Sequence, residues 1–135
     1  MGQQYIHKDL TDEIISAFYR VYNELGFGFL ENVYQNALYI ELLENGLSVE
    51  AQKMIKVYYL NRVVGNYRAD LIVENTVILE LKATEYLVES DEIQLINYLK
   101  ATNIEIGLLL NFGKKPEIRR KIFTNDRKQH TNKNL

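Results

Sequence analysis

Hydrophobic residues in the first third of the chain recur at the spacing of an α-helix. Between residues 9 and 26, four apolar positions repeat every three or four residues and would form one helix face: Ile14, Phe18, Val21 and Leu25. Asp9 or Thr11 is the expected N-cap, and Gly26 is the expected stop. After a Gly-Phe-Gly connection, a second helix is predicted over residues 30–44, ended by Asn45-Gly46.

The pattern changes from helical to strand-like at Val49. Three segments rich in β-branched and aromatic residues follow, and they span residues 49–60, 63–73 and 76–81. The breaks between them are Asn61-Arg62 and Glu74-Asn75, which are turn signals. This arrangement predicts three strands that follow one another as hairpins.

The second half of the chain predicts one more helix and two more strands. Ser90 can cap a helix over residues 91–101, whose acidic residues lie in the first turn, where the helix dipole favours them. Residues 104–111 are nearly all apolar, as in a central strand, and residues 118–123 are expected to add an edge strand. We therefore expect a single α/β domain over residues 1–123, in the order α-α-β-β-β-α-β.

Charge is distributed unevenly along the chain. The net charge is −2, but from Lys114 onward eight basic residues stand against two acidic ones, a balance of +6 that leaves −8 for the rest. This basic segment from Lys114 onward could follow a phosphate backbone, and its last part, a basic tail at residues 124–135, is expected to be disordered. A solvated C-terminus without a partner explains the same pattern equally well.

Composition excludes several kinds of site. The absence of cysteine excludes disulfides, thiolate metal sites and cysteine nucleophiles. The two histidines, His7 and His130, lie near the termini, which argues against a histidine-rich metal centre or a Ser-His triad. Any metal would then be bound by oxygen ligands, which favours magnesium, manganese or calcium. No apolar run is long enough for a membrane span or a signal peptide, so we expect a cytoplasmic protein.

The strongest chemical signal is an acidic residue on one predicted strand and a Glu-x-Lys on the next. Asp70 lies near the end of the strand over residues 63–73, and Glu80, Leu81 and Lys82 end the following one. Two carboxylates can hold a hard cation, and a lysine beside them can handle a proton or a phosphate charge. This combination favours a metal-dependent phosphodiesterase.

The loop between these strands decides whether the acidic residues meet. With a two-residue loop, Asp70 would face Leu79, and Glu80 would point to the other side of the sheet. A three-residue loop over residues 74–76, or one bulge, places Asp70 opposite Glu80, and Lys82 joins them by alternation. Arg68, two residues before Asp70, should share its face by the same rule. The site therefore requires the longer loop.

Two helical positions add candidate residues. Glu31 shares a helix face with Tyr34 and Leu38, so its carboxylate is expected to be buried and to need a cation or hydrogen bonds. Gln94 and Tyr98 stand four residues apart on the third helix and should project together.

These residues together resemble a known family. The stretch Gly28-Phe29-Leu30-Glu31-Asn32-Val33-Tyr34 resembles the GxxExxY signature of small bacterial and archaeal proteins assigned to the PD-(D/E)XK nuclease superfamily. Asp70 with Glu80-x-Lys82 is similar to the core motif of that superfamily, although Ala69 stands where the motif name has proline. Gln94-x-x-x-Tyr98 resembles a motif of its RecB-like branch, and the similarity runs from about residue 14 to residue 123.

The resemblance implies a restriction-endonuclease-like fold, a mixed sheet of about four to five strands flanked by helices, and a metal site. Asp70, Glu80 and the backbone carbonyl of Leu81 would coordinate Mg²⁺ or Mn²⁺, and Glu31 would complete the shell directly or through water. Lys82 would orient or deprotonate the attacking water, or offset charge in the transition state.

The remaining residues would surround this centre. Gln94 would hold Lys82 or a phosphate oxygen, Tyr98 would support that network, and Arg68 would touch a phosphate or pair with an acid. The implied substrate is nucleic acid, DNA rather than RNA, and a homodimer would supply two sites for cutting two strands.

Other readings of the same residues remain open at this level. Asp70, Glu80 and Lys82 form ion pairs in many proteins without catalysis, and Tyr98 fits core packing. A catalytically silent module that binds nucleic acid or a partner protein is the main alternative, and a purely structural cation is another.

Overall fold

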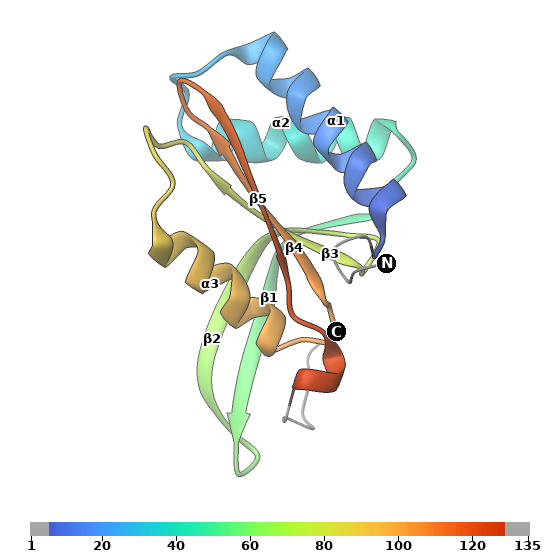
Figure 1. Ribbon diagram of the computed structural model, residues 1–135, viewed down its shortest axis with the longest axis vertical. Coiled ribbons are helices and arrows are strands. Elements are labelled where there is room, and N and C mark those ends of the chain that lie inside the picture. The colour runs from blue at the N-terminus through green and yellow to red at the C-terminus, as the bar shows by residue number, and fades with distance from the viewer. Residues whose placement is uncertain (1–5, 129–135) are drawn as a thin grey trace.

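The computed structural model describes residues 6–128 and shows an α/β fold built on one five-stranded mixed sheet, with strand order β1-β2-β3-β4-β5 (Figure 1). The predicted order of elements is confirmed, with the edge strand added at the end. The elements are α1 (Lys8–Leu25), α2 (Glu31–Glu44), β1 (Val49–Tyr59), β2 (Arg62–Val73), β3 (Val77–Lys82), α3 (Glu89–Lys100), β4 (Ile106–Phe112), β5 (Pro116–Ile122) and a short 3-10 helix (Asn125–Arg127). No helix within residues 6–128 is long and apolar enough to span a membrane.

Helix ends differ from the predicted caps. Gly26 ends α1 as predicted, with φ 69° and its N–H donating to the carbonyl of Tyr22 at 2.8 Å. His7, and not Asp9 or Thr11, is the N-cap of α1. Ser90 likewise lies inside the first turn of α3, because Val88 is the N-cap and donates its N–H to Asp91 at 3.1 Å. Both cap predictions were therefore wrong by a few residues.

The register of the sheet confirms the longer loop between β2 and β3. Val73 pairs with Val77 and Leu71 with Leu79, so residues 74–76 form the connection. β3 and β4 run parallel, whereas the other neighbouring pairs are antiparallel. β4 is an interior strand and entirely buried, and β5 is the predicted edge strand.

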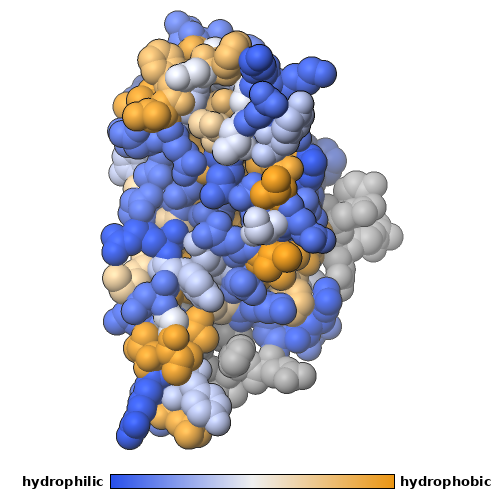
Figure 2. All heavy atoms as spheres, turned by 90° about the vertical axis from the view of Figure 1, so that its left-hand side faces the viewer, coloured by the Kyte–Doolittle hydropathy of each residue, from blue (hydrophilic) through white to orange (hydrophobic). Residues whose placement is uncertain are grey.

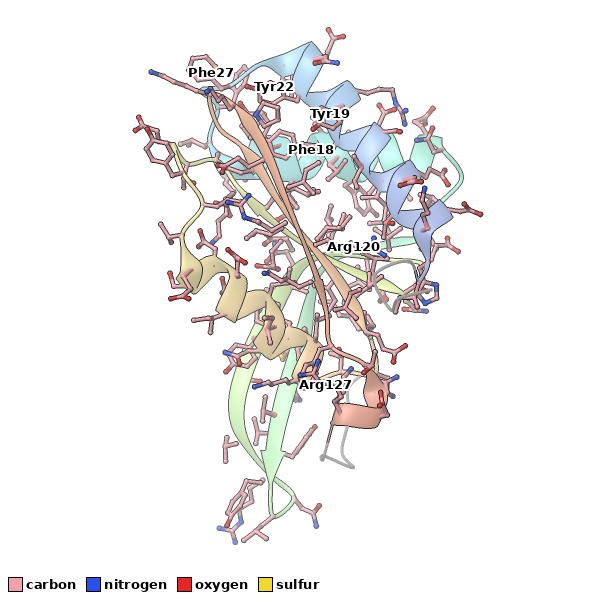
Figure 3. All side chains as sticks on the ribbon, viewed as in Figure 1. Phe18, Tyr19, Tyr22, Phe27, Arg120 and Arg127 are labelled. Carbon is pink, nitrogen blue, oxygen red and sulfur yellow. The ribbon has the colours of Figure 1, made fainter. Side chains whose placement is uncertain are left out.

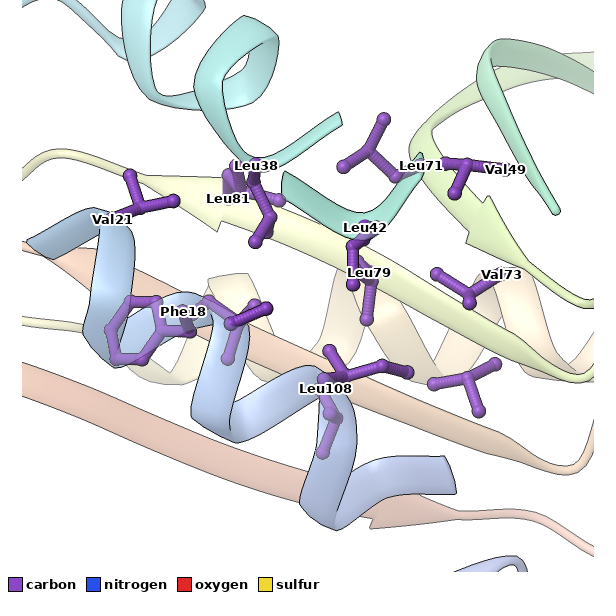
Figure 4. Close-up of a cluster of buried hydrophobic side chains, with 14 of the residues drawn as sticks. Phe18, Val21, Leu38, Leu42, Val49, Leu71, Val73, Leu79, Leu81 and Leu108 are labelled. Atoms are coloured by element: carbon purple, nitrogen blue, oxygen red, sulfur yellow. The ribbon is translucent and has the colours of Figure 1, made fainter. Parts of the chain in front are cut away.

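Each face of the sheet carries its own hydrophobic core. α1 and α2 cover one face, and Figure 4 shows their side chains meeting those of the strands: Phe18, Val21, Leu38, Leu42, Leu71, Val73, Leu79, Leu81 and Leu108. On the other face, α3 packs Leu95, Tyr98 and Leu99 against Ile72, Ile78 and Leu109. Burial of these apolar surfaces is what stabilises a three-layer fold of this size.

Alternation along β2 is interrupted at Asp70. Leu71 packs toward α1 and α2, whereas Ala69, two residues earlier, belongs to the core under α3. A regular strand would place both on one face. The interruption means that the position of Arg68 does not follow from that of Asp70, and the expected shared face is not supported.

The C-terminal basic residues are largely engaged in the fold. Arg120 donates to Thr11 Oγ1 and to the carbonyl of Ile6, each at 2.7 Å, and so ties β5 to the start of α1 (Figure 3). Arg119 and Lys121 both pair with Glu92 of α3. These three residues of the basic C-terminal segment therefore connect β5 to α1 and α3.

Residues 124–128, which were predicted to belong to a disordered tail, are part of the fold. Thr124 is buried, Asn125–Arg127 form the 3-10 helix, and Lys128 Nζ donates to the carbonyls of Thr102 and Ile104 at 2.9 and 2.8 Å. Residues 129–135 lie outside the described part of the chain.

Close approach of two backbones makes Gly113 hard to replace. A Cβ at this position would lie 2.2 Å from the carbonyl oxygen of Thr84, which is backbone and cannot rotate away. We expect Gly113→Ala to lower the free energy of unfolding by about 2 kcal/mol, as overpacking in a dense interior does. Urea unfolding measures this change. Gly65→Ala is the matched control, because its Cβ would meet Val57 only at an ordinary 3.6 Å. Equal midpoints for both variants would contradict the prediction.

Candidate active site

Two carboxylates connect β2 and β3 where the backbone pairing between the strands ends. The last paired residues are Leu71 and Leu79. Beyond them, the N–H of Asp70 donates to Glu80 Oε2 at 2.9 Å, and the N–H of Leu81 donates to Asp70 Oδ2 at 2.8 Å. Side-chain oxygens thus replace the carbonyl acceptors of a regular ladder. These two hydrogen bonds fix both carboxylates next to each other. The prediction that Asp70 lies opposite Glu80 is therefore confirmed.

Burial makes this point unfavourable for negative charge. Glu80 is only 4% exposed, and its pKa is raised to about 8, mainly by burial and then by the neighbouring Asp70. Burial also raises the pKa of Asp70, against the lowering effect of the Leu81 N–H and of Lys82. A cation placed between the two carboxylates would remove this penalty.

Lys82 is held between the acidic pair and the start of α3. Its Nζ lies 3.8 Å from Asp91 Oδ1, while Oδ2 of the same carboxylate caps the helix through Val88. Its charge lowers the pKa of Asp70, Glu80 and Glu31, so all three carboxylates lie within its field. Sequence reasoning missed Asp91, because Val88 carries none of the side chains that mark a helix N-cap.

Glu31 is exposed, and the prediction that its carboxylate is buried was wrong. Glu31 is the first residue of α2, and the buried residues on this face of the helix begin only at Tyr34. The Tyr34 hydroxyl donates to the carbonyl of Gly26 at 2.6 Å and accepts the N–H of Phe29 at 3.2 Å, which fixes the connection before Glu31. Partial desolvation nevertheless raises the pKa of Glu31, and Lys82 opposes this shift. Glu31 therefore borders the site.

Gln94 and Tyr98 project together from α3. The side-chain amide of Gln94 donates to the Tyr98 hydroxyl at 2.9 Å. Burial and the nearby Glu80 raise the pKa of Tyr98 to about 12, so the hydroxyl keeps its proton and can donate a hydrogen bond of its own. Its ring packs against Tyr67 with centroids 5.2 Å apart. Tyr98 thus combines core packing with a position beside the acidic pair.

Two glutamines complete the surroundings of Asp70, and sequence reasoning missed both. Gln52 of β1 donates to Gln35 of α2 at 2.8 Å and lies 3.5 Å from Asp70 Oδ1. Gln52 has φ 55°, in the left-handed region that a strand residue rarely adopts. No periodicity or motif marks these residues, because their encounter depends on the packing of α2 against the edge of the sheet.

The donor atoms suit a small hard cation bound by few protein ligands. Glu80 Oε2 and Asp70 Oδ2 accept backbone N–H groups, so the further oxygen donors for a cation are Glu80 Oε1 and Asp70 Oδ1, the latter 3.5 Å from the Gln52 amide. Within residues 6–128, no group of three or more His, Cys, Asp or Glu side chains is close enough to hold a metal ion. Asp70 and Glu80 match the one or two carboxylates that a magnesium-type ion uses while it keeps several waters.

The protein combines an α/β fold with a site of two carboxylates and a lysine. The site lies where the pairing of two sheet strands ends. A family model described as PD-(D/E)XK nuclease superfamily matches residues 8–121. The protein belongs to this superfamily, and its five-stranded mixed sheet flanked by helices is the restriction-endonuclease-like fold that the sequence predicted. No curated protein and no solved structure gives a significant match.

Proposed function

We propose that this protein is a divalent-metal-dependent nuclease that hydrolyses phosphodiester bonds in nucleic acid, with DNA as the expected substrate. The observation that carries the proposal is the reciprocal pairing of Asp70 and Glu80, in which each carboxylate accepts a backbone N–H of the opposite strand. This pairing confines two acids in a buried position beside Lys82. Membership of the nuclease superfamily supports the same activity.

Asp70 and Glu80, with the backbone carbonyl of Leu81, are the proposed ligands of Mg²⁺ or Mn²⁺. When bound, such an ion would lower the pKa of a water molecule and offset the charge that develops on the scissile phosphate. Glu31, at the border of the site, would contribute through water. The finer placement within the superfamily, among GxxExxY proteins and near the RecB-like branch, rests on residues 28–34 and on Gln94 with Tyr98.

The other side chains would orient the reacting groups. Lys82 would position the attacking water or donate to a phosphate oxygen. Asp91 would keep the ammonium group of Lys82 at the site. Tyr98, with its proton retained and its oxygen bonded to Gln94, would donate to a phosphate oxygen or to Glu80. Arg68, exposed and outside the acidic pair, would contact a flanking phosphate.

The testing experiment is a cleavage assay on labelled single- and double-stranded DNA and RNA. We expect cleavage in Mg²⁺ or Mn²⁺, and none in the presence of a chelator. Asp70→Asn should remove cleavage, whereas Glu85→Gln should retain it, because Glu85 is an exposed acid just beyond Lys82. Cleavage that survives chelation or the Asp70 change would overturn the proposal.

A catalytically silent module is the second candidate. The absence of a third acidic ligand within residues 6–128 favours it. Such a module would bind nucleic acid, or a partner protein, without cutting in any metal. Nucleic-acid binding without turnover in the same assay would select this function.

A further inference from the structure

The hairpin of β1 and β2 extends beyond the body of the sheet. β2 pairs with β3 only over Leu71 to Val73, so from Ala69 back to Arg62 its partner in the sheet is β1 alone. This two-stranded segment, residues 53–69, is called the arm below. Figure 1 shows it projecting at the lower end of the molecule, with α3 beside its upper part. The eight residue-to-residue steps from Arg62 to Asp70 span about 26 Å.

The arm is basic, as is the segment from residue 114 onward, whereas the other parts of the chain are acidic. Between Ala51 and Ala69 there is no Asp or Glu, and there are four basic residues: Lys53, Lys56, Arg62 and Arg68. Since the net charge of the chain is −2, the remaining residues carry −6. Lys53 pairs with Glu50 at the base of the arm. Arg62 and Arg68 are exposed and form no ion pair with any acid among residues 6–128. Such a separation of charge suits an anionic partner.

The tip of the arm presents apolar side chains to solvent. Tyr59, Leu60 and Val64 are 67%, 78% and 63% exposed. Figure 2 shows hydrophobic and hydrophilic side chains together at this lower end. Leu60 and Asn61 form the turn with φ values of 48° and 63°, which glycine or asparagine adopts at lower cost than leucine. Leu60 is thus exposed to solvent although it is hydrophobic, and it adopts a left-handed backbone conformation that leucine disfavours.

We propose that the arm binds duplex DNA, with Arg62 and Arg68 on phosphates and Leu60 inserted into a groove. This inference rests on the proposed function and names the form of its substrate. A two-stranded ribbon fits the major groove, and apolar wedges also enter base steps from the minor groove. Because Arg68 lies two residues from Asp70 on β2, a phosphate bound by Arg68 would lie near the acidic pair. A second copy of the chain is a poorer occupant, since two arms of equal charge repel.

Salt-dependent binding tests the arm without any need for cleavage. Fluorescence anisotropy with a labelled 30-base-pair duplex is recorded for the full chain in chelator over a series of salt concentrations. Each phosphate contact contributes about 0.9 to the slope of log K against log salt, so Arg62→Gln with Arg68→Gln should lower the slope by about 2. Affinity at low salt should fall at least about tenfold. The control, Lys114→Gln with Lys115→Gln, removes the same charge at the β4–β5 turn and should leave the slope unchanged.

A separate variant tests the role of Leu60 at the tip of the arm. Leu60→Asn suits the left-handed turn but removes the apolar side chain, and we expect weaker duplex binding at an unchanged slope. No binding of wild type to the duplex, a wild-type slope in the double arginine variant, or equal loss from single strands and duplex would each overturn the proposal. A dimer in sedimentation that Leu60→Asn converts to monomer would show that the tip serves a second copy instead. Because binding is measured without cleavage, an inactive protein that keeps the arm effect refutes only the proposed nuclease.

Discussion

Replacing Glu80 with glutamine is expected to abolish metal-dependent cleavage and at the same time to stabilise the fold. Glutamine retains an oxygen that can accept the N–H of Asp70, so the junction of β2 and β3 keeps its hydrogen bond. It removes, however, one of the two carboxylates that would hold the metal. We expect a loss of about a thousandfold in rate, the upper end of what removing one preorganised electrostatic group from a catalytic site costs.

The gain in stability follows from the pKa of Glu80. In the folded protein the pKa is about 8, whereas the ordinary value is 4.5. The neutral carboxyl is therefore favoured by folding, and this contribution is complete below about pH 4.5 and is lost as pH rises through 8. In chelator, wild type should lose stability over this window, and Glu80→Gln should lose less. At about 1.4 kcal/mol per pKa unit, discounted for coupling to Asp70, we expect a difference of about 2 kcal/mol at pH 8.

Thermal unfolding in chelator at pH 5 and pH 8 measures this difference. A change of this size corresponds to roughly 4–10 °C in Tm at pH 8 for a domain of this length, with little difference at pH 5. Added Mg²⁺ should raise the Tm of wild type but not of Glu80→Gln, because binding to the folded state alone stabilises it. A Gln variant that is less stable than wild type at pH 8 would show that the carboxylate is satisfied without a metal. Glu85→Gln is the control for a change in net charge.

Replacing Lys82 with methionine is expected to separate catalysis from metal binding. The ammonium group lies within the field of Asp70, Glu80 and Glu31 and lowers the pKa of each. Its removal should slow cleavage by about a hundredfold to a thousandfold, since a positioned proton donor or charge is lost. The same change should strengthen Mg²⁺ binding several-fold, because a positive charge beside the two carboxylates disappears.

Calorimetric titration with Mg²⁺ and a cleavage assay on one preparation measure the two effects. Lys8→Met is the matched control, because Lys8 pairs with Asp12 on an exposed helix surface away from the site. Unchanged cleavage in Lys82→Met would remove this residue from the proposed chemistry. Weaker Mg²⁺ binding would mean that Lys82 maintains the geometry of the site through Asp91, and not its charge balance.

The loop over residues 74–76 is a feature of the site that the sequence predicted only in part. Alternation left two registers for β2 and β3, and only the requirement that Asp70 meet Glu80 selected the longer loop, which the structure contains. The same alternation does not place Arg68 relative to Asp70, because Ala69 and Leu71 belong to the cores on opposite faces of the sheet. A period-two rule holds within a regular ladder, and the site lies where the ladder ends.

Residues around the acidic pair were harder to predict than the pair itself. Asp70, Glu80 and Lys82 are near in sequence and carry a motif, so their encounter needs only one hairpin. Asp91, Gln52 and Gln35 come from α3, β1 and α2, and each reaches the site through the packing of a separate element. Glu31 was expected to be buried from its helical face, but a helix face is covered only where another element lies against it.

The sequence by itself determined the elements, their order, the single α/β sheet and the acid–acid–lysine set, because hydrophobic periodicity and short motifs are local properties of the chain. Only the tertiary structure decided that Asp70 and Glu80 each accept a backbone N–H of the opposite strand and that Lys82 pairs with Asp91. It also decided that the hairpin continues beyond the sheet as a basic arm. Those features depend on strand divergence, burial and the meeting of distant elements, and no local pattern in the chain encodes them.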